Sequence, residues 1–152
     1  MEKRLSAFEL KVIELHNLLL NERQVALRCL ETVQESLEIL RNNSNPDHEK
    51  GLQDSVIKRF EYTIDYFWKY LKLYMVENEK MEVLVSSPKA ILKEAFTVGL
   101  IRDDELRVLE KALNSRNLTS HMYHEEVSLD ILDQVPKCYE SMLQIINRLK
   151  IK

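Results

Sequence analysis

Five polar residues near the end of the chain have the types and spacing that phosphoryl transfer without a metal would need. They are Arg116, Asn117, Ser120, His121 and Tyr123. Histidine titrates near neutral pH and can move a proton, while a guanidinium can hold two non-bridging oxygens of a phosphate. The cluster is our candidate site, although a polar patch at a helix end can also simply pair with itself.

This cluster lies on the face of a predicted helix whose earlier residues are apolar. A helix start is predicted at Asp103 and Asp104, whose carboxylates suit the positive end of a helix dipole. Leu106, Leu109 and Leu113 then share one face, and the polar cluster takes over that face further along. Buried polar groups without partners cost about 1 to 3 kcal/mol each. The cluster must therefore pair internally, meet a second subunit or line a cleft.

The spacing within the cluster constrains the geometry of the site. Asn117 precedes His121 by four residues, so its amide can orient the imidazole. Arg116 and His121 are five residues apart, which corresponds to roughly 140° and ~7.5 Å on an ideal helix. Either Arg116 reaches across, or the helix ends here, or a second copy of the chain completes the site.

A metal site is an alternative for the same region. His121, His124, Glu125 and Glu126 supply four potential ligands. The sequence contains neither a zincin spacing nor the Glu-x-x-His pair of di-iron bundles. We therefore expect no metal and no cofactor.

The elements that position the cluster are helices. Two glycines and three prolines among 152 residues leave little turn chemistry for a sheet, and good helix formers fill most of the chain. Apolar periodicity and cap signals predict helices over about 5–40, 47–78, 88–98, 103 onward and 128–150. The predicted fold is all-α, an antiparallel up-and-down bundle of about five helices with a four-helix core, forming a single domain over residues 1–152.

Some features of these helices allow more than one interpretation. Glu22 and Arg23 interrupt the first stripe, which indicates a bend or a helix end near Asn21. Pro136 should kink the last helix or mark a restart. The short helix after the Ser87-Pro88 start signal should bury a face made of Ile91, Leu92, Ala95 and Phe96.

An aromatic stripe runs along the second helix. Tyr62, Tyr66 and Tyr70 recur every four residues and resemble a platform for stacking bases. Tyrosines at this spacing are more typical of the edge of a core or an interface, because each hides a ring and keeps its hydroxyl wet. We therefore do not predict a nucleotide site there.

Charge and cysteine content narrow the class of protein. The net charge of −3 argues against a broad basic surface for nucleic acid, but it leaves room for a small local RNA site. The first residues contain no apolar run of signal-peptide length, so we expect a soluble, cytoplasmic protein. Cys29 and Cys138 form no CxxC pair and are expected to be reduced core residues.

Several blocks of the sequence together resemble the HEPN superfamily, in particular the HepT-like proteins often named nucleotidyltransferase substrate-binding proteins. The motif has the form Arg, four residues, His, one residue, Tyr. The blocks are Arg59-Phe60-Glu61-Tyr62-Thr63, Phe67-Trp68-Lys69, Ser87-Pro88, Glu94-Ala95-Phe96, Gly99-Leu100-Ile101 and Arg116 to His121. The resemblance covers about residues 52–150. Residues 1–21 are an N-terminal helical extension beyond it, and His124 stands where many relatives have Asn or Asp.

The resemblance implies a homodimeric helical bundle that forms a complex with a minimal nucleotidyltransferase, without a membrane association. Related HepT proteins are metal-independent ribonuclease toxins, silenced when the partner transfers AMP to the motif tyrosine. Carried over by position, Arg116 and His121 would be the catalytic pair, Asn117 and Ser120 their supports, and Tyr123 the AMP acceptor.

Three functions stay open at this point. The first is a toxin ribonuclease. The second is a non-catalytic subunit that presents substrate or nucleotide to the transferase, and the third is a structural adaptor whose polar cluster only pairs across a dimer.

Overall fold

The chain folds into five helices, with no strand in the described part. The computed structural model describes residues 4–121 and 125–152, and for 117–121 and 125–127 it describes the backbone alone. The helices are α1 (Ala7–Arg41), α2 (Pro46–Glu77), α3 (Pro88–Thr97), α4 (Asp103–His121) and α5 (Glu125–Arg148). The predicted all-α bundle is confirmed, and its four long helices are α1, α2, α4 and α5.

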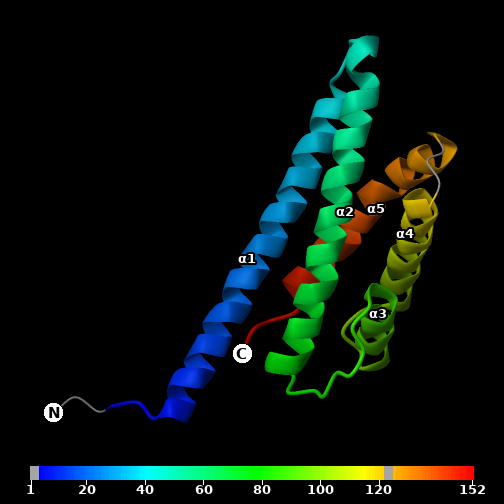
Figure 1. Cartoon of the computed structure of the whole chain (residues 1–152). Helices are drawn as coiled ribbons and strands as arrows, with labels where there is room; N and C mark the ends of the chain where they lie inside the picture. Colours follow the sequence, from blue (N-terminus) through cyan, green and yellow to red (C-terminus); the bar gives the residue numbers. More distant parts are fainter. Residues whose placement is uncertain (1–3, 122–124) are drawn as a thin grey trace.

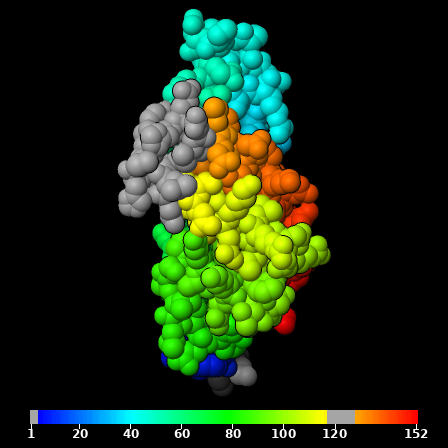
Figure 2. Space-filling view, turned by 90° about the vertical axis from the view of Figure 1, so that its right-hand side faces the viewer, coloured from blue at the N-terminus to red at the C-terminus, as the bar shows by residue number. Residues whose placement is uncertain are grey.

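Two antiparallel helix pairs make up the bundle (Figure 1). α1 packs mainly on α2, and α4 packs mainly on α5, while α3 contacts α2 and α4. Figure 2 shows the side of the molecule that α3, α4 and α5 form. The tip of the α1–α2 hairpin, coloured cyan, extends beyond these helices. The hairpin therefore forms the long axis of the molecule, and the α4–α5 pair lies against its flank.

Side-chain caps set the first residues of α1 and α2. Ser6 and Glu9 form a reciprocal capping box at the start of α1. The Asn45 side chain accepts the Asp47 N–H at the start of α2, where Pro46 occupies the first helical position. Ser87 caps α3 by position, but its side chain makes no capping hydrogen bond, so the predicted hydroxyl cap is not formed.

The core lies where the apolar stripes of all five helices meet. Phe60, Phe67, Leu109, Met142 and Ile145 are among its fully buried members. Leu106 and Leu113 are also buried, which confirms the predicted apolar face of α4. Burial of such side chains contributes about 1.5 to 3 kcal/mol each relative to exposure, and this is the main force that holds the helices together.

Three predictions about the helices need correction. α1 is one continuous helix through Asn21, so a helix end there is wrong: Glu22 and Arg23 are partly buried within it. α5 continues through Pro136 as a single helix, so there is no restart. Phe96 is 40% exposed, because α3 buries only Ile91, Leu92 and Ala95.

The beginning of α1 is exposed on its apolar side. Leu19 is buried, but Phe8, Val12 and Ile13 are exposed, with Phe8 at 77%. Figure 1 shows this end of α1 diverging from α2. The stripe that periodicity predicts is present there, but no other part of the described chain covers it.

A matched pair of glycines allows the turn after α3 to be tested. Gly99 has φ +82°, a conformation that side-chain-bearing residues rarely adopt, whereas Gly51 lies within α2 with open space around its Cβ position. We expect Gly99→Ala to lower the free energy of unfolding by about 1 to 2 kcal/mol. Gly51→Ala should raise it by about 0.5 to 1 kcal/mol. Urea denaturation of both variants checks this, and equal effects of the same sign would contradict it.

Candidate functional site

Arg116 is held in place by a carboxylate on another helix. Its Nη1 and Nη2 donate to Oδ1 and Oδ2 of Asp65 on α2, at 2.8 and 3.2 Å. The arginine is partly buried at the end of the apolar face of α4. Two parallel charge-assisted hydrogen bonds fix the plane of the guanidinium as well as its position. This ion pair gives the candidate site a fixed cation, connected to α2.

Asp65 is a site residue that sequence reasoning missed. It precedes Arg116 by 51 residues and sits between buried Ile64 and exposed Tyr66 on α2. The sequence signal was only a carboxylate at the edge of an apolar stripe, which is common on amphipathic helices. The partner of such a group depends on how α4 packs against α2, and no local pattern contains that information.

A cavity of about 200 Å³ opens beside Arg116. Ser87, Pro88 and Lys89 at the start of α3 line it from one side, and Leu113 and Arg116 from α4 line it from the other. Two of these side chains are cationic, and none of the described lining residues is acidic. The cavity therefore combines an apolar floor with positive charge, which suits a phosphate-bearing ligand.

A polar network next to the cluster joins α4 to α5. The amide of Gln134 donates to Ser115 Oγ at 3.0 Å and to Asp130 Oδ2 at 3.1 Å, and the Ser115 hydroxyl lies 3.1 Å from the same carboxylate. Ser115 and Gln134 are both buried. Because Ser115 precedes Arg116 directly, the network fixes the helical register at the point where the candidate motif begins.

The backbone of α4 remains helical from Arg116 through His121. The alternative that the helix ends between these two residues is therefore wrong, and they stand roughly 140° apart around one continuous helix. The side chains of Asn117, Ser120 and His121 lie outside the described part of the chain, as does Tyr123 entirely. Of the predicted site residues, Arg116 is the one whose contacts are described.

The ligands considered for a metal site fall in the same region. The side chains of His121, His124, Glu125 and Glu126 all lie outside the described residues. Among the residues whose side chains are described, no group of three or more His, Cys, Asp or Glu comes together.

The cysteines offer no nucleophile for the site. Neither forms a disulfide, and Cys138 is fully buried. Burial raises the pKa of the Cys138 thiol to about 12, and burial also raises the pKa of the half-buried Cys29. Both thiols are protonated at neutral pH, so they are poor nucleophiles there.

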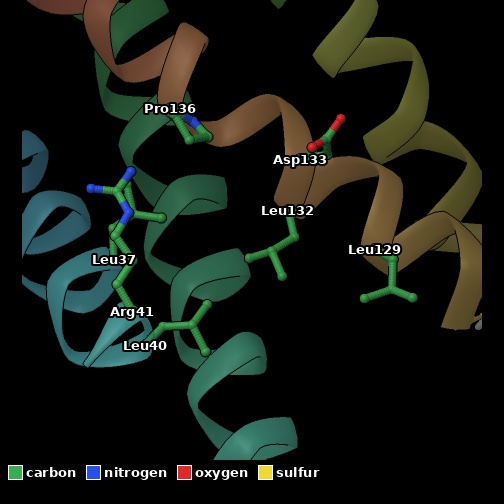
Figure 3. A pocket seen from close by; sticks show the side chains of 7 residues that line it. All are labelled: Leu37, Leu40, Arg41, Leu129, Leu132, Asp133 and Pro136. Atoms are coloured by element: carbon green, nitrogen blue, oxygen red, sulfur yellow. The ribbon is translucent and has the colours of Figure 1, made fainter. Parts of the chain in front are cut away.

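A second cavity, of about 270 Å³, lies between α1 and α5 away from Arg116 (Figure 3). Its walls are mostly apolar and include Leu37, Leu40, Leu129, Leu132 and Pro136. Arg41 and Asp133 add one charge of each sign. The described lining of this cavity thus carries one charge of each sign, whereas the lining of the cavity beside Arg116 includes two cations, so Arg116 remains the centre of the candidate site.

Comparison with known families gives a match over almost the whole chain. The profile of the family described as "Nucleotidyltransferase substrate binding protein like" matches residues 5–151. The chain belongs to this family. The match begins at Leu5, so it extends over the whole of α1 as well as over α4, which carries the motif from Arg116 to His121.

A solved structure supports this family assignment. The crystal structure of a protein from Thermus thermophilus is 35% identical, with a TM-score of 0.69. The similarity covers 82% of this chain and 98% of the Thermus chain. No curated protein matches this family member. Within the described part of the chain, no helix combines the length and the apolar content that a membrane span requires.

Proposed function

We propose that this protein is the partner of a minimal nucleotidyltransferase in a two-gene toxin–antitoxin module. In this proposal it is a metal-independent endoribonuclease, and transfer of AMP to Tyr123 silences it. The observation that carries the proposal is the guanidinium of Arg116, fixed by Asp65 beside a cavity with positive walls. The family description, which names a nucleotidyltransferase, and the motif from Arg116 to Tyr123 support the partner and the control step.

The reaction follows from the chemistry of two side chains. His121 accepts the proton of a ribose 2′-hydroxyl as its oxygen attacks the adjacent phosphorus. A new bond forms between that oxygen and phosphorus, while the bond from phosphorus to the 5′-oxygen of the next nucleotide breaks. This leaving oxygen takes up a proton from water, and His121 releases the proton it accepted to water. Arg116 stabilises the charge that builds up on the non-bridging oxygens. The products are a 2′,3′-cyclic phosphate and a 5′-hydroxyl.

Asp65 acts on this reaction through Arg116. A long arginine side chain loses conformational freedom when it binds a phosphate, and the two hydrogen bonds from Asp65 restrict it beforehand. The carboxylate also reduces the net positive charge that a phosphate meets. In the proposal Asp65 is a positioning residue, and its effect is a balance between better orientation and weaker attraction.

The continuous helix favours a site built from two copies of the chain. The five-residue separation of Arg116 and His121 on α4 corresponds to roughly 140° around an ideal helix. In the proposal, one phosphate is therefore contacted by Arg116 of one subunit and by the histidine of another. A two-fold axis near the ends of the two α4 helices would create two such sites. We therefore include a homodimer in the proposed function, with Asn117 and Ser120 supporting the catalytic pair.

AMP on Tyr123 would silence the site by charge and bulk. The acceptor is two residues from His121. An adenylyl group adds a negative phosphodiester, which repels the RNA backbone and competes for the same cations.

A second candidate function is favoured by the cavity itself. Its volume of about 200 Å³ and its two cations, Lys89 and Arg116, suit the phosphate portion of a nucleotide. In that case the protein presents a substrate to the transferase and cleaves no RNA, as the family description suggests.

Intact mass measurement after incubation with the partner transferase and ATP tests the two functions. We expect one adenylyl adduct per chain on the wild type and none on Tyr123→Phe. Adenylylated protein should also lose its RNA cleavage. Absence of the adduct, together with nucleotide retained on the wild type but not on a Lys89→Gln variant, would contradict the toxin proposal and support the substrate-binding function.

A further inference from the structure

The outward face of α2 carries lysines and tyrosines. Lys58, Tyr62, Tyr66 and Lys69 follow one another at spacings of four, four and three residues, and all four are exposed. The run covers about 16 Å of the helix axis. We call this set of four residues the α2 face. α1 and the α3–α4 layer lie on either side of α2 (Figure 1). The exposure of all four residues shows that the α2 face is left uncovered.

The tyrosines of the α2 face differ from the third tyrosine of the stripe. Tyr62 and Tyr66 are 38% and 40% exposed, whereas Tyr70 is 2% exposed and belongs to the core. The Tyr62 hydroxyl is 2.6 Å from Thr32 Oγ1 on α1, which fixes the ring in place. Tyr70 is therefore a core residue and not a core-edge residue, whereas Tyr62 and Tyr66 are partly covered and present the rest of their surface to solvent.

The charges of the α2 face are positive, although the chain as a whole carries −3. Lys58 and Lys69 form no ion pair with other described residues, and Lys69 Nζ lies 5.7 Å from the centre of the Trp68 ring. Asp65 lies between the two tyrosines along the helix, but its carboxylate is engaged by Arg116. Glu61, at the edge of the α2 face, is partly buried. Because Asp65 contacts Arg116, the α2 face is adjacent to the proposed catalytic arginine.

We propose that the α2 face binds the single-stranded RNA substrate and leads it to Arg116. This inference rests on the proposed ribonuclease function. Lys58 and Lys69 contact phosphates, and bases stack on Tyr62 and Tyr66, as exposed aromatic rings allow without sequence preference. Lysine is depleted in protein–protein interfaces, whereas tyrosine is enriched there. The combination of the two favours a polyanion with flat bases over a protein partner.

Fluorescence anisotropy with a labelled single-stranded RNA oligomer at low salt tests the α2 face. Tyr66→Ala should weaken binding by about 5- to 150-fold, while Tyr66→Phe, which keeps the ring, should bind as the wild type does. The double variant Lys58→Gln/Lys69→Gln should reduce the slope of log affinity against log salt by about 1.4. Lys137→Gln, an exposed lysine on α5, is the matched control and should change neither quantity.

The outcomes separate this inference from the proposed function. If the wild type cleaves RNA and Tyr66→Ala binds and cleaves it equally well, the α2 face does not bind the substrate RNA, and the proposed ribonuclease function is unaffected. If Tyr66→Ala loses RNA binding while no variant or wild type cleaves RNA, the α2 face is supported and the ribonuclease is not. If these substitutions instead weaken only the complex with the transferase, the α2 face is a protein interface and our inference is wrong.

Discussion

Substitution of His121 by alanine is expected to lower the rate of RNA cleavage by about 10²- to 10⁴-fold, which is the usual contribution of a general base. The loss arises because no other group in the motif from Arg116 to Tyr123 titrates near neutral pH. The measurement is single-turnover cleavage of a labelled RNA by the wild type and the variant at equal concentrations. The helical content should remain, since α4 is already anchored through Ser115 and Arg116.

Two companion variants identify the source of the effect. His16→Ala, at an exposed position of α1, should cleave at the wild-type rate. Arg116→Lys keeps a positive charge but cannot form the two-pronged pair with Asp65, so it should reduce cleavage without preventing RNA binding. A His121→Ala protein that still cleaves RNA at the wild-type rate would refute the proposed mechanism.

Substitution of Arg148 by methionine is expected to lower the free energy of unfolding by about 3 kcal/mol. Arg148 on α5 donates to both oxygens of Glu105 on α4, at 2.6 and 3.1 Å, and also to the carbonyl of Leu100. Glu105 is only 1% exposed. Without the guanidinium, a buried carboxylate would lose its counter-charge. A loss of this size is a large part of the roughly 5 to 15 kcal/mol typical of a folded domain.

Urea denaturation measures this loss of unfolding free energy. An exposed ion pair on α4 serves as the control. Arg107 and Asp103 form a pair at 2.9 Å in which both side chains are largely exposed. Arg107→Met should cost at most about 1 kcal/mol. Equal losses for Arg107→Met and Arg148→Met would show that burial of Glu105 does not determine the energy of its pair.

Local signals were sufficient to predict the helices of this fold. The paired carboxylates of Asp103 and Asp104 act within the first turn of α4, so this helix start can be read directly from the sequence. The exposure of Phe96 could not be predicted, because its place on the wheel of α3 is apolar and only the packing of α2 and α4 decides which face is covered. The same holds for Phe8, whose apolar stripe extends past the part of α1 that packs in the bundle.

Only part of the candidate site could be predicted from the sequence. The change from leucine to polar residues along α4 pointed to Arg116, since it breaks a periodic pattern. Asp65 and Lys89 belong to other helices and meet Arg116 only through tertiary packing. The sequence predicted the motif, but the surroundings of its arginine required the arrangement of α2, α3 and α4.

The α4–α5 pair is fastened near both ends by side chains that cross between the helices. Arg148 and Glu105 join them at one end, and Ser115, Asp130 and Gln134 join them about 15 Å further along α4. The backbone amide hydrogens of α4 and α5 between these two sets of contacts should therefore exchange with solvent only when the two helices separate from each other in one cooperative step.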